Sequence, residues 1–408
     1  MAVPKLRFKA DDGSDYPEWN DFTKLEDISA FITKGATPTT YGFDWQPNGV
    51  YFFRNDCIKN NVFVYGDYSF IAEEANKFLQ RSEVTGGDIV IAITGDIGKV
   101  GLIPSEVKKA NINQHLARVR IVKDAFPYFV YMYLCSDKVQ RTYKKIKTGL
   151  SMPQLSLAQI RDTNIPVVSL PEQQKIAEFL STIDTVIVKQ RETVFAWEER
   201  KKGVMQKLFS QEVRFKADDG SDFPEWEEKK IDDLFYKVNE RNNGQFGKDK
   251  WISVAKMYYQ DEDKVTSNNI DTRTYVMRVG DMSFEGHPNK EFKYGRFVVN
   301  DIGDGIISEL FPIYRHKENY ILKYWKYAIQ VDSIMQKIYR KSITSSGASS
   351  NKLDDDDFKR QSILVLCLAE QQKIADCLSS LDEVIETQKA TLAAWEELKK
   401  GLLQQMFV

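Results

Sequence analysis

Apolar residues recur at alternating steps of four and three in two stretches of the chain, the spacing of a heptad seam along a long helix. The first seam consists of Ile176, Leu180, Ile183, Ile187, Gln190, Val194, Trp197, Lys201, Val204 and Leu208. The second consists of Ile374, Leu378, Leu381, Ile385, Gln388, Leu392, Trp395, Lys399, Leu402 and Met406. Each seam predicts an unbroken helix roughly 55–60 Å long at 1.5 Å per residue.

The two seams predict that the helices pair with each other, and antiparallel pairing would place one globular domain at each end. A glutamine stands at the same rung of both seams, and burying Gln190 and Gln388 would cost stability but fix the register. Helix pairing or partner docking is assigned to Ile176, Leu180, Ile183, Ile187, Gln190, Trp197, Ile374, Leu378, Leu381, Ile385, Gln388 and Trp395. The alternative is that both are ordinary amphipathic surface helices, and leftover faces could also dock helices of another protein.

Outside these helices the pattern changes to short apolar runs separated by glycine and proline, which is typical of strands in mixed domains. Strands are predicted at 50–53, 61–65, 88–93 and 116–122, followed by a helix at 128–147. The second half repeats this plan, with strands at 251–255, 275–279, 296–299 and 306–314 and a helix at 320–339. The expected fold class is α+β, with two mixed α/β domains separated by two long antiparallel coiled-coil helices in a pseudo-two-fold arrangement.

The chain repeats itself, but only in parts. Residues 7–15, Arg-Phe-Lys-Ala-Asp-Asp-Gly-Ser-Asp, return unchanged at 214–222, and residues 170–209 align without a gap with 368–407. Gly87-Asp88 and Gly280-Asp281 also correspond, each opening a strand-like run. The stretches between barely match, so two roles with different constraints are expected, with the copied parts held alike by a common partner. The resulting division is 1–19, a conserved segment; 20–169, a variable domain; 170–210, a conserved helix; 211–229, the repeated segment; 230–367, a second variable domain; and 368–408, the second conserved helix.

Composition and charge narrow the class of protein without naming it. The 408 residues are 42% hydrophobic and 28% charged, a globular balance, and the net charge of −2 argues against a general polyanion binder. The four cysteines, Cys57, Cys135, Cys367 and Cys377, lack metal-site spacing and are expected to be reduced thiols. No secretory signal or membrane span is evident, so a cytoplasmic location is expected.

A polar, glycine-containing loop with basic residues follows the helix of each variable domain. Basic side chains beside hydroxyls and amides suit contacts to DNA phosphates and base edges, although a solvated loop is the alternative for any single residue. A third segment of this kind spans 33–38. The candidate DNA-binding residues are Lys34, Thr37, Lys144, Lys147, Thr148, Gln154, Arg340, Lys341, Ser346, Asn351 and Lys352.

No constellation of catalytic residues stands out in the sequence. Residues 95–99 resemble a phosphate-binding loop but lack its first glycine and its Ser/Thr. Asp281 with residues 291–293 loosely resembles a nuclease's metal-binding pattern, which is common by chance and missing from the other half. A binding role without a metal or cofactor is therefore favoured over catalysis.

The repeated Leu-x-Glu-Gln-Gln-Lys-Ile-Ala at 170–177 and 368–375, placed after two variable domains, resembles the specificity subunit of a bacterial type I restriction-modification system. The resemblance covers the whole chain. It implies that each variable domain is a target-recognition domain for one half of a bipartite sequence in double-stranded DNA, and that the helices set the spacer. It also implies two methylation subunits and restriction subunits as partners, which would hold S-adenosylmethionine, ATP and magnesium, while this chain is no enzyme.

Two other functions remain open at this point. The chain could be a coiled-coil scaffold that binds only proteins, or a self-sufficient nuclease or methylase. Sequence-selective, salt-dependent DNA binding by the assembled complex would exclude the scaffold. Cutting or methylation of DNA by the isolated chain would support the enzyme.

Overall fold

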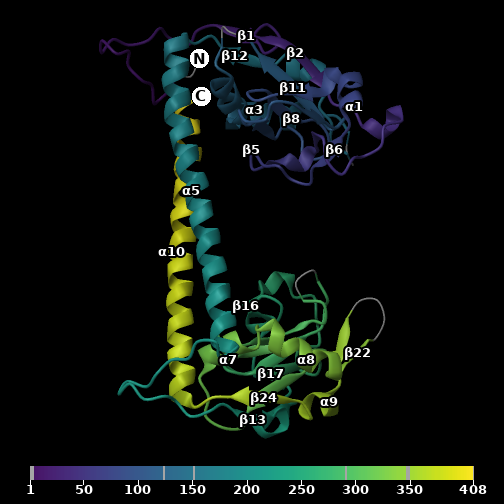
Figure 1. Cartoon of the computed structure of the whole chain (residues 1–408), viewed down its shortest axis with the longest axis vertical. Helices are drawn as coiled ribbons and strands as arrows, with labels where there is room; N and C mark the ends of the chain where they lie inside the picture. Colours follow the sequence, from purple (N-terminus) through teal and green to yellow (C-terminus); the bar gives the residue numbers. More distant parts are fainter. Residues whose placement is uncertain (1–3, 123–124, 150–151, 290–291, 346–349, 408) are drawn as a thin grey trace. The chain divides into compact units, whose positions relative to one another are not determined.

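The structure, a computed structural model, describes residues 4–122, 125–149, 152–289, 292–345 and 350–407 (Figure 1). It divides into two units: unit 1 is Met1–Glu192 with Ala390–Val408, and unit 2 is Thr193–Lys389. Each unit therefore contains a variable domain and segments of both long helices.

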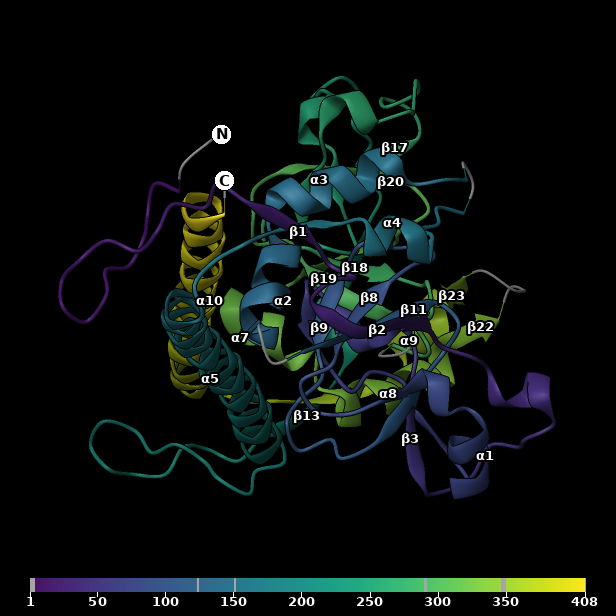
Figure 2. The same cartoon turned by 90° about the horizontal axis from the view of Figure 1, so that it is seen from above.

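The two long helices are confirmed as α5 (Leu170–Phe209) and α10 (Leu368–Met406). In unit 1 the first half of α5 lies along the last half of α10, and Lys399 Nζ is 2.6 Å from Asp184 Oδ1. In unit 2 the end of α5 lies along the start of α10, and Lys201 Nζ is 2.6 Å from Asp382 Oδ1. The pairing is therefore antiparallel, and Figures 1 and 2 show the two helices side by side.

Among its described residues, unit 1 contains two four-stranded sheets and four short helices. The first sheet has the order β2-β11-β8-β9 and is antiparallel throughout, and the second, β6-β3-β10-β7, has a parallel pair between β3 and β10. The strands are β1 (Phe22–Lys24), β2 (Ser29–Lys34), β3 (Val50–Phe53), β4 (Ile58–Lys59), β5 (Val62–Phe63), β6 (Ser69–Ile71), β7 (Glu83–Val84), β8 (Ile89–Ala92), β9 (Val100–Leu102), β10 (Ala110–Ile112), β11 (Leu116–Ile121) and β12 (Asn164–Pro166). The helices are α1 (Glu73–Phe78), α2 (Pro127–Cys135), α3 (Asp137–Ile146) and α4 (Leu157–Arg161).

The described part of unit 2 contains a four-stranded antiparallel sheet, of order β14-β21-β18-β19, and several two-stranded pairs. Its strands are β13 (Glu227–Lys230), β14 (Phe235–Val238), β15 (Ile252–Ser253), β16 (Tyr258–Tyr259), β17 (Thr274–Met277), β18 (Met282–Glu285), β19 (Arg296–Val299), β20 (Gly305–Ser308), β21 (Ile313–His316), β22 (Ile343–Ser345), β23 (Asn351–Leu353) and β24 (Ser362–Val365). Its helices are α6 (Ile231–Leu234), α7 (Leu322–Ala328), α8 (Asp332–Ser342) and α9 (Asp355–Lys359).

The main sheets of the two units have the same topology although their sequences barely match. In each sheet the strand that comes first in the sequence pairs with the one that comes last, β2 with β11 and β14 with β21. The last strand also pairs with the first strand of a hairpin, β8–β9 in unit 1 and β18–β19 in unit 2. The central strands start immediately after Gly87-Asp88 and Gly280-Asp281, so the predicted correspondence of these pairs is confirmed. The two variable domains therefore share one frame, by which we mean the strand order of the main sheet and the Gly-Asp pair before its central strand.

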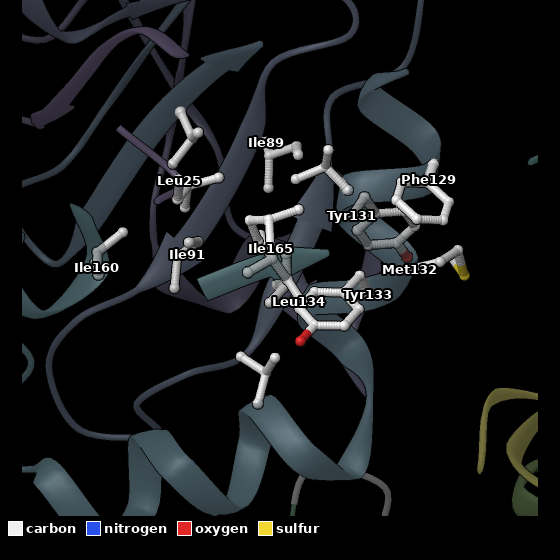
Figure 3. Close-up of a cluster of buried hydrophobic side chains, with 14 of the residues drawn as sticks. Leu25, Ile89, Ile91, Phe129, Tyr131, Met132, Tyr133, Leu134, Ile160 and Ile165 are labelled. Atoms are coloured by element: carbon white, nitrogen blue, oxygen red, sulfur yellow. The ribbon is translucent and has the colours of Figure 1, made fainter. Parts of the chain in front are cut away.

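The central strand β8 is buried on both faces, which explains its unbroken apolar run. Ile89 and Ile91 face a core shared with α2, as Figure 3 shows, whereas Val90 and Ala92 face the core of the second sheet. The ends of the long helices belong to these domain cores. Ile176 and Leu180 lie in the core of unit 1, and Ile374 and Leu378 in that of unit 2.

Three predicted elements are interrupted in the structure. The predicted helix at 128–147 is two helices, because Ser136 has extended backbone dihedrals between the fully apolar α2 and the amphipathic α3. The predicted helix at 320–339 is likewise divided into α7 and α8 at residues 329–331. The predicted strand at 306–314 is divided into β20 and β21, with Pro312, which has no N–H to donate, just before β21. All four cysteines are free thiols.

Candidate nucleic-acid interface

The first predicted DNA-contact loop of unit 1 is anchored to the end of the central strand β8. Thr148 and Gln154 close the loop by exchanging backbone hydrogen bonds of 3.0 and 2.8 Å. Gln154 also forms a bridge with Thr94, and Gly95 N donates to Pro153 O at 3.1 Å. Lys147, Thr148 and Gln154 are exposed, so the polar face of this loop is available to a ligand.

The other predicted segment of unit 1 begins at Lys34, the last residue of β2, continues past Thr37 and lies against the turn at 113–116. Gly35 makes this approach possible, because a Cβ there would lie 2.1 Å from Asn113 O. Thr37 Oγ1 donates to Gln114 Oε1 in the turn. On the other side of the turn, the backbone N of residue 93 donates to the carbonyl of residue 115 at 2.9 Å. Hydrogen bonds thus connect this segment, through the 113–116 turn, to residues 93–95, which directly follow β8.

We call residues 34–38, 93–95, 113–116, 148–149 and 152–155 the loop edge of unit 1. The structure brings the two predicted segments together there, although more than a hundred residues separate them in the sequence. It adds Gln114, an exposed amide that our sequence reasoning did not single out. A glutamine beside a threonine hydroxyl is a signal of base-edge contact, but only the fold places the two side chains together.

Next to the loop edge is a hollow of about 450 Å³ with a basic rim. Lys99, Lys144 and Lys147 line it, together with Asp96. Lys99 Nζ lies 2.6 Å from Asp96 Oδ2, and this hydrogen bond lowers the pKa of the Asp96 carboxyl. Lysines around a hollow beside exposed amides suit the contact of one DNA phosphate beside the bases being read.

Unit 2 has a corresponding loop edge at the end of β18. Arg340 and Lys341 lie exposed at the end of α8, and Asn351 and Lys352 lie on β23 of the following hairpin, which Figure 1 places on the side of unit 2 away from α10. Asn351 N donates to Gly286 O at 2.9 Å, which ties the hairpin to the end of β18. Ser346 lies outside the described residues.

In each unit an ion pair between a buried aspartate and a partly exposed arginine lies at the start of the central strand, at the strand end opposite the loop edge. Arg120 donates from Nε and Nη2 to the two carboxylate oxygens of Asp88 at 2.6 Å each, and Arg315 does the same to Asp281 at 2.7 and 2.8 Å. These hydrogen bonds raise the pKa of both arginines. Asp281 is thereby engaged in a structural pair, and Glu291 of the weak nuclease-like pattern lies outside the described residues.

The repeated Glu-Gln-Gln-Lys signature is largely an internal clamp. Glu172 is fully buried and accepts hydrogen bonds from Arg7 at 3.0 and 2.9 Å and from the indole N–H of Trp19 at 3.1 Å. Gln173, also buried, accepts from Phe126 N at 2.9 Å, where α2 begins.

Unit 2 reproduces these contacts. Glu370 accepts from Arg214 at 3.1 and 3.0 Å and from Trp226 at 3.1 Å, and Gln371 accepts from Ile321 N at 3.3 Å. The expectation that the copied segments match because they fit one partner therefore needs correction for these residues. They match because each holds its own domain and its own conserved segment on the helix.

The seam residues are buried or half-buried in both helices. Ile176, Leu180, Ile374 and Leu378 are at most 1% exposed, so they cannot touch a partner subunit. Leu381, Gln190, Gln388, Trp197 and Trp395 are half-buried, and Ile183, Ile187 and Ile385 are buried.

Two seam lysines have partners that the sequence did not predict. Lys399 pairs with Asp184, whose carboxylate also accepts a hydrogen bond from Tyr128 of α2. Lys201 pairs with Asp382, which accepts from Tyr327 of α7 at 2.7 Å. In each unit the aspartate of one long helix therefore binds both a tyrosine of the variable domain and a lysine of the other long helix.

The relatives of the chain agree with this architecture. Residues 17–194 match the family described as type I restriction modification DNA specificity domain. The MjaVIII specificity subunit of the type I restriction enzyme of Methanocaldococcus jannaschii is 23% identical over 97% of this chain and 94% of its own length.

Solved structures show the same fold. The S subunit of a type I restriction-modification system from M. genitalium matches with a TM-score of 0.53 and 14% identity, over 100% of this chain and 99% of that one. A chain from a structure of the type I R-M system in complex assembly matches with a TM-score of 0.55 and 15% identity, over 95% and 97%. None of the described helices is long and apolar enough to cross a membrane. In its duplicated signature, its fold and these relatives, the chain is similar to the specificity subunits of type I restriction-modification systems.

Proposed function

We propose that this chain is the DNA-recognition subunit of a type I restriction-modification complex, in which unit 1 reads one half of a bipartite target and unit 2 the other. The observation that carries the proposal is that both units have the same sheet topology but different exposed residues at their loop edges. The buried Asp–Arg pair and the main-sheet topology are the same in both units, while the exposed residues at the ends of β8 and β18 differ. Two readers on one frame suit a target with two different half-sites.

The chain supplies recognition, and partner subunits supply the chemistry. Methylation subunits that use S-adenosylmethionine, with restriction subunits that use ATP and magnesium, would act on the DNA that this chain selects. The long helices would set the spacer between the half-sites, since half-sites one DNA turn apart need about 34 Å between the readers and α5 alone has 40 residues. Exposed, identical residues of the two helices, such as Gln174 and Gln372, remain available for two copies of one partner.

The deciding experiment is methylome sequencing of cells that contain the full complex, before and after residues 20–169 are replaced by those of another specificity subunit. We expect a bipartite methylated sequence in which the swap changes one half and leaves the other half and the spacer intact. An unchanged sequence after the swap would contradict the proposal. Methylation or cleavage by the isolated chain would instead show that the chemistry lies in this chain.

The basic hollow offers a second test at the level of affinity. Replacing Lys144 and Lys147 with alanine should weaken binding to specific and unrelated DNA alike. It should reduce the slope of log affinity against log salt by about 0.9 for each phosphate that the variant no longer neutralises. Lys77→Ala, an exposed lysine of α1 that does not line the hollow, is the control. An unchanged salt slope would exclude phosphate binding at the hollow.

A further inference from the structure

The end of β18 carries a polar pair that the equivalent strand of unit 1 lacks. Counted from the shared Gly-Asp, Glu285 corresponds to Ala92 and His287 corresponds to Thr94. His287 Nδ1 lies 2.6 Å from Glu285 Oε1, and the backbone N of His287 donates to the same oxygen at 3.0 Å. A carboxylate and an imidazole have thus replaced an alanine and a threonine in a frame that is otherwise shared.

The two partners differ sharply in exposure. The Glu285 side chain is 6% exposed, whereas that of His287 is 62% exposed. Arg296, which pairs with Glu285 across the strands, turns its guanidinium to Ala255 O instead. A buried carboxylate is costly to desolvate unless it is paired, and His287 supplies that pairing from both its backbone and its ring. The exposed ring is therefore held by a rigid, buried group.

The surrounding backbone is packed closely enough to hold this geometry. A Cβ on Gly286 would lie 2.1 Å from Asn351 O, and a Cβ on Gly295 would lie 2.4 Å from Glu285 O. The β22–β23 hairpin with its candidate DNA-contact residues is thus pressed against the residue between Glu285 and His287. The ring centroid of Phe311 is 6.5 Å from that of His287.

The ring of His287 contacts Glu285 through Nδ1, the ring atom that lies 2.6 Å from Glu285 Oε1. Nε2 is then the ring atom available to an outside partner. A recognition group whose orientation is already fixed loses little entropy on binding, which favours selective contacts. We propose that His287, positioned by Glu285, reads one base pair of the half-site recognised by unit 2.

This inference rests on the proposed function, and it adds a specificity-determining residue that acts together with the paired strands β22 and β23. A base-edge contact differs from a phosphate contact in its signature. Loss of a base contact relaxes the sequence at one position, whereas loss of a phosphate contact weakens all sites alike. A purely structural role for His287 would likewise weaken methylation at all sites alike and would leave the recognised sequence unchanged.

The test is methylome sequencing with the complete complex containing His287→Thr, the residue that the frame carries at this point in unit 1. We expect one position of one half-site to become degenerate, with discrimination there reduced roughly 5- to 150-fold. The other half-site and the spacer should stay as in the wild type. Thr94→Ser in unit 1 is the matched control and should leave the half-site of unit 2 unchanged.

A second variant tests the positioning role of Glu285. Glu285→Gln keeps the size and one accepting oxygen but loses the charge, so we expect a smaller relaxation at the same base position as in His287→Thr. An unchanged recognition sequence in His287→Thr, a uniform loss of methylation at every site, or relaxation at different positions in the two variants would each overturn the proposal. If the wild-type complex itself methylates no bipartite sequence, the proposed function fails instead.

Discussion

The buried clamp at Glu172 predicts a large loss of stability from a change of one atom. Glu172→Gln keeps the shape of the side chain but removes its charge and turns an N–H₂ group toward Arg7 or Trp19, which are themselves donors. Breaking a buried ion pair costs about 3–5 kcal/mol. The Arg7 side chain is 18% exposed and can regain some hydration, so we expect a loss of about 2–4 kcal/mol.

The loss should be confined to the unit that contains the clamp. For a unit of this size, 1 kcal/mol lowers the melting temperature by about 2–4 °C, so calorimetry should show a downward shift of roughly 4–16 °C for unit 1. Glu370→Gln removes the same contacts from unit 2 and should shift its transition by a similar amount. Gln174→Ala is the control, because its exposed amide donates to Glu178, one turn away on the same helix. A shift for Glu172→Gln no larger than that of the control would refute the clamp.

Three further outcomes follow from buried groups. Asp88→Asn should cost about 2–3 kcal/mol in urea unfolding because Arg120 loses its bidentate partner, and a midpoint equal to the wild type would contradict that role. Burial lowers the pKa of His316 to about 3, so the native ring stays neutral while the unfolded ring takes up a proton near pH 6.5. Stability should therefore fall as the pH drops from about 6.5 toward 3, by at most about 1.4 kcal/mol per pH unit, and His316→Phe should flatten this slope in acid unfolding. Burial raises the pKa of the Cys57 thiol to about 12, so iodoacetamide at pH 8 should label it only after urea is added; labelling in the native chain, read by mass spectrometry, would disprove its burial.

The periodic parts of the chain were predictable because their pattern is local. The heptad seams predict helices whatever the tertiary contacts are, and α5 and α10 lie within the predicted stretches. The central strand β8 was also predicted, because a strand buried on both faces tends to be apolar throughout. Its counterpart β18 contains Ser283 and Glu285, and only the matching Gly280-Asp281 pair indicated it. The interrupted elements were less predictable. Ser136 is a small polar residue that a helix can accommodate, and only the packing of α2 inside the core shows why the helix stops there.

The candidate interface was predicted in pieces and assembled only by the fold. Lys34 and Thr37 were singled out separately from Lys147 and Gln154, and hydrogen bonds through the 113–116 turn join them into one loop edge. Gln114 was missed because it lies between two buried strands without a local signal. The assignment of the DNA-contact residues stays a prediction until the complex is tested.

By itself the sequence determined the duplication, the two long helices and the division into parts that match and parts that differ, because repeats and heptads are visible without knowing any contact. Only the tertiary structure decided why the matching parts match. Glu172 and Glu370 are charged residues in an exposed-looking signature, yet both are fully buried by segments about 150 residues away in the sequence. It also showed that two domains of unlike sequence each contain a sheet of the same topology and an equivalent Asp–Arg pair. Long-range strand pairing constrains the topology and a few buried charges, whereas the exposed loop edges are free to differ.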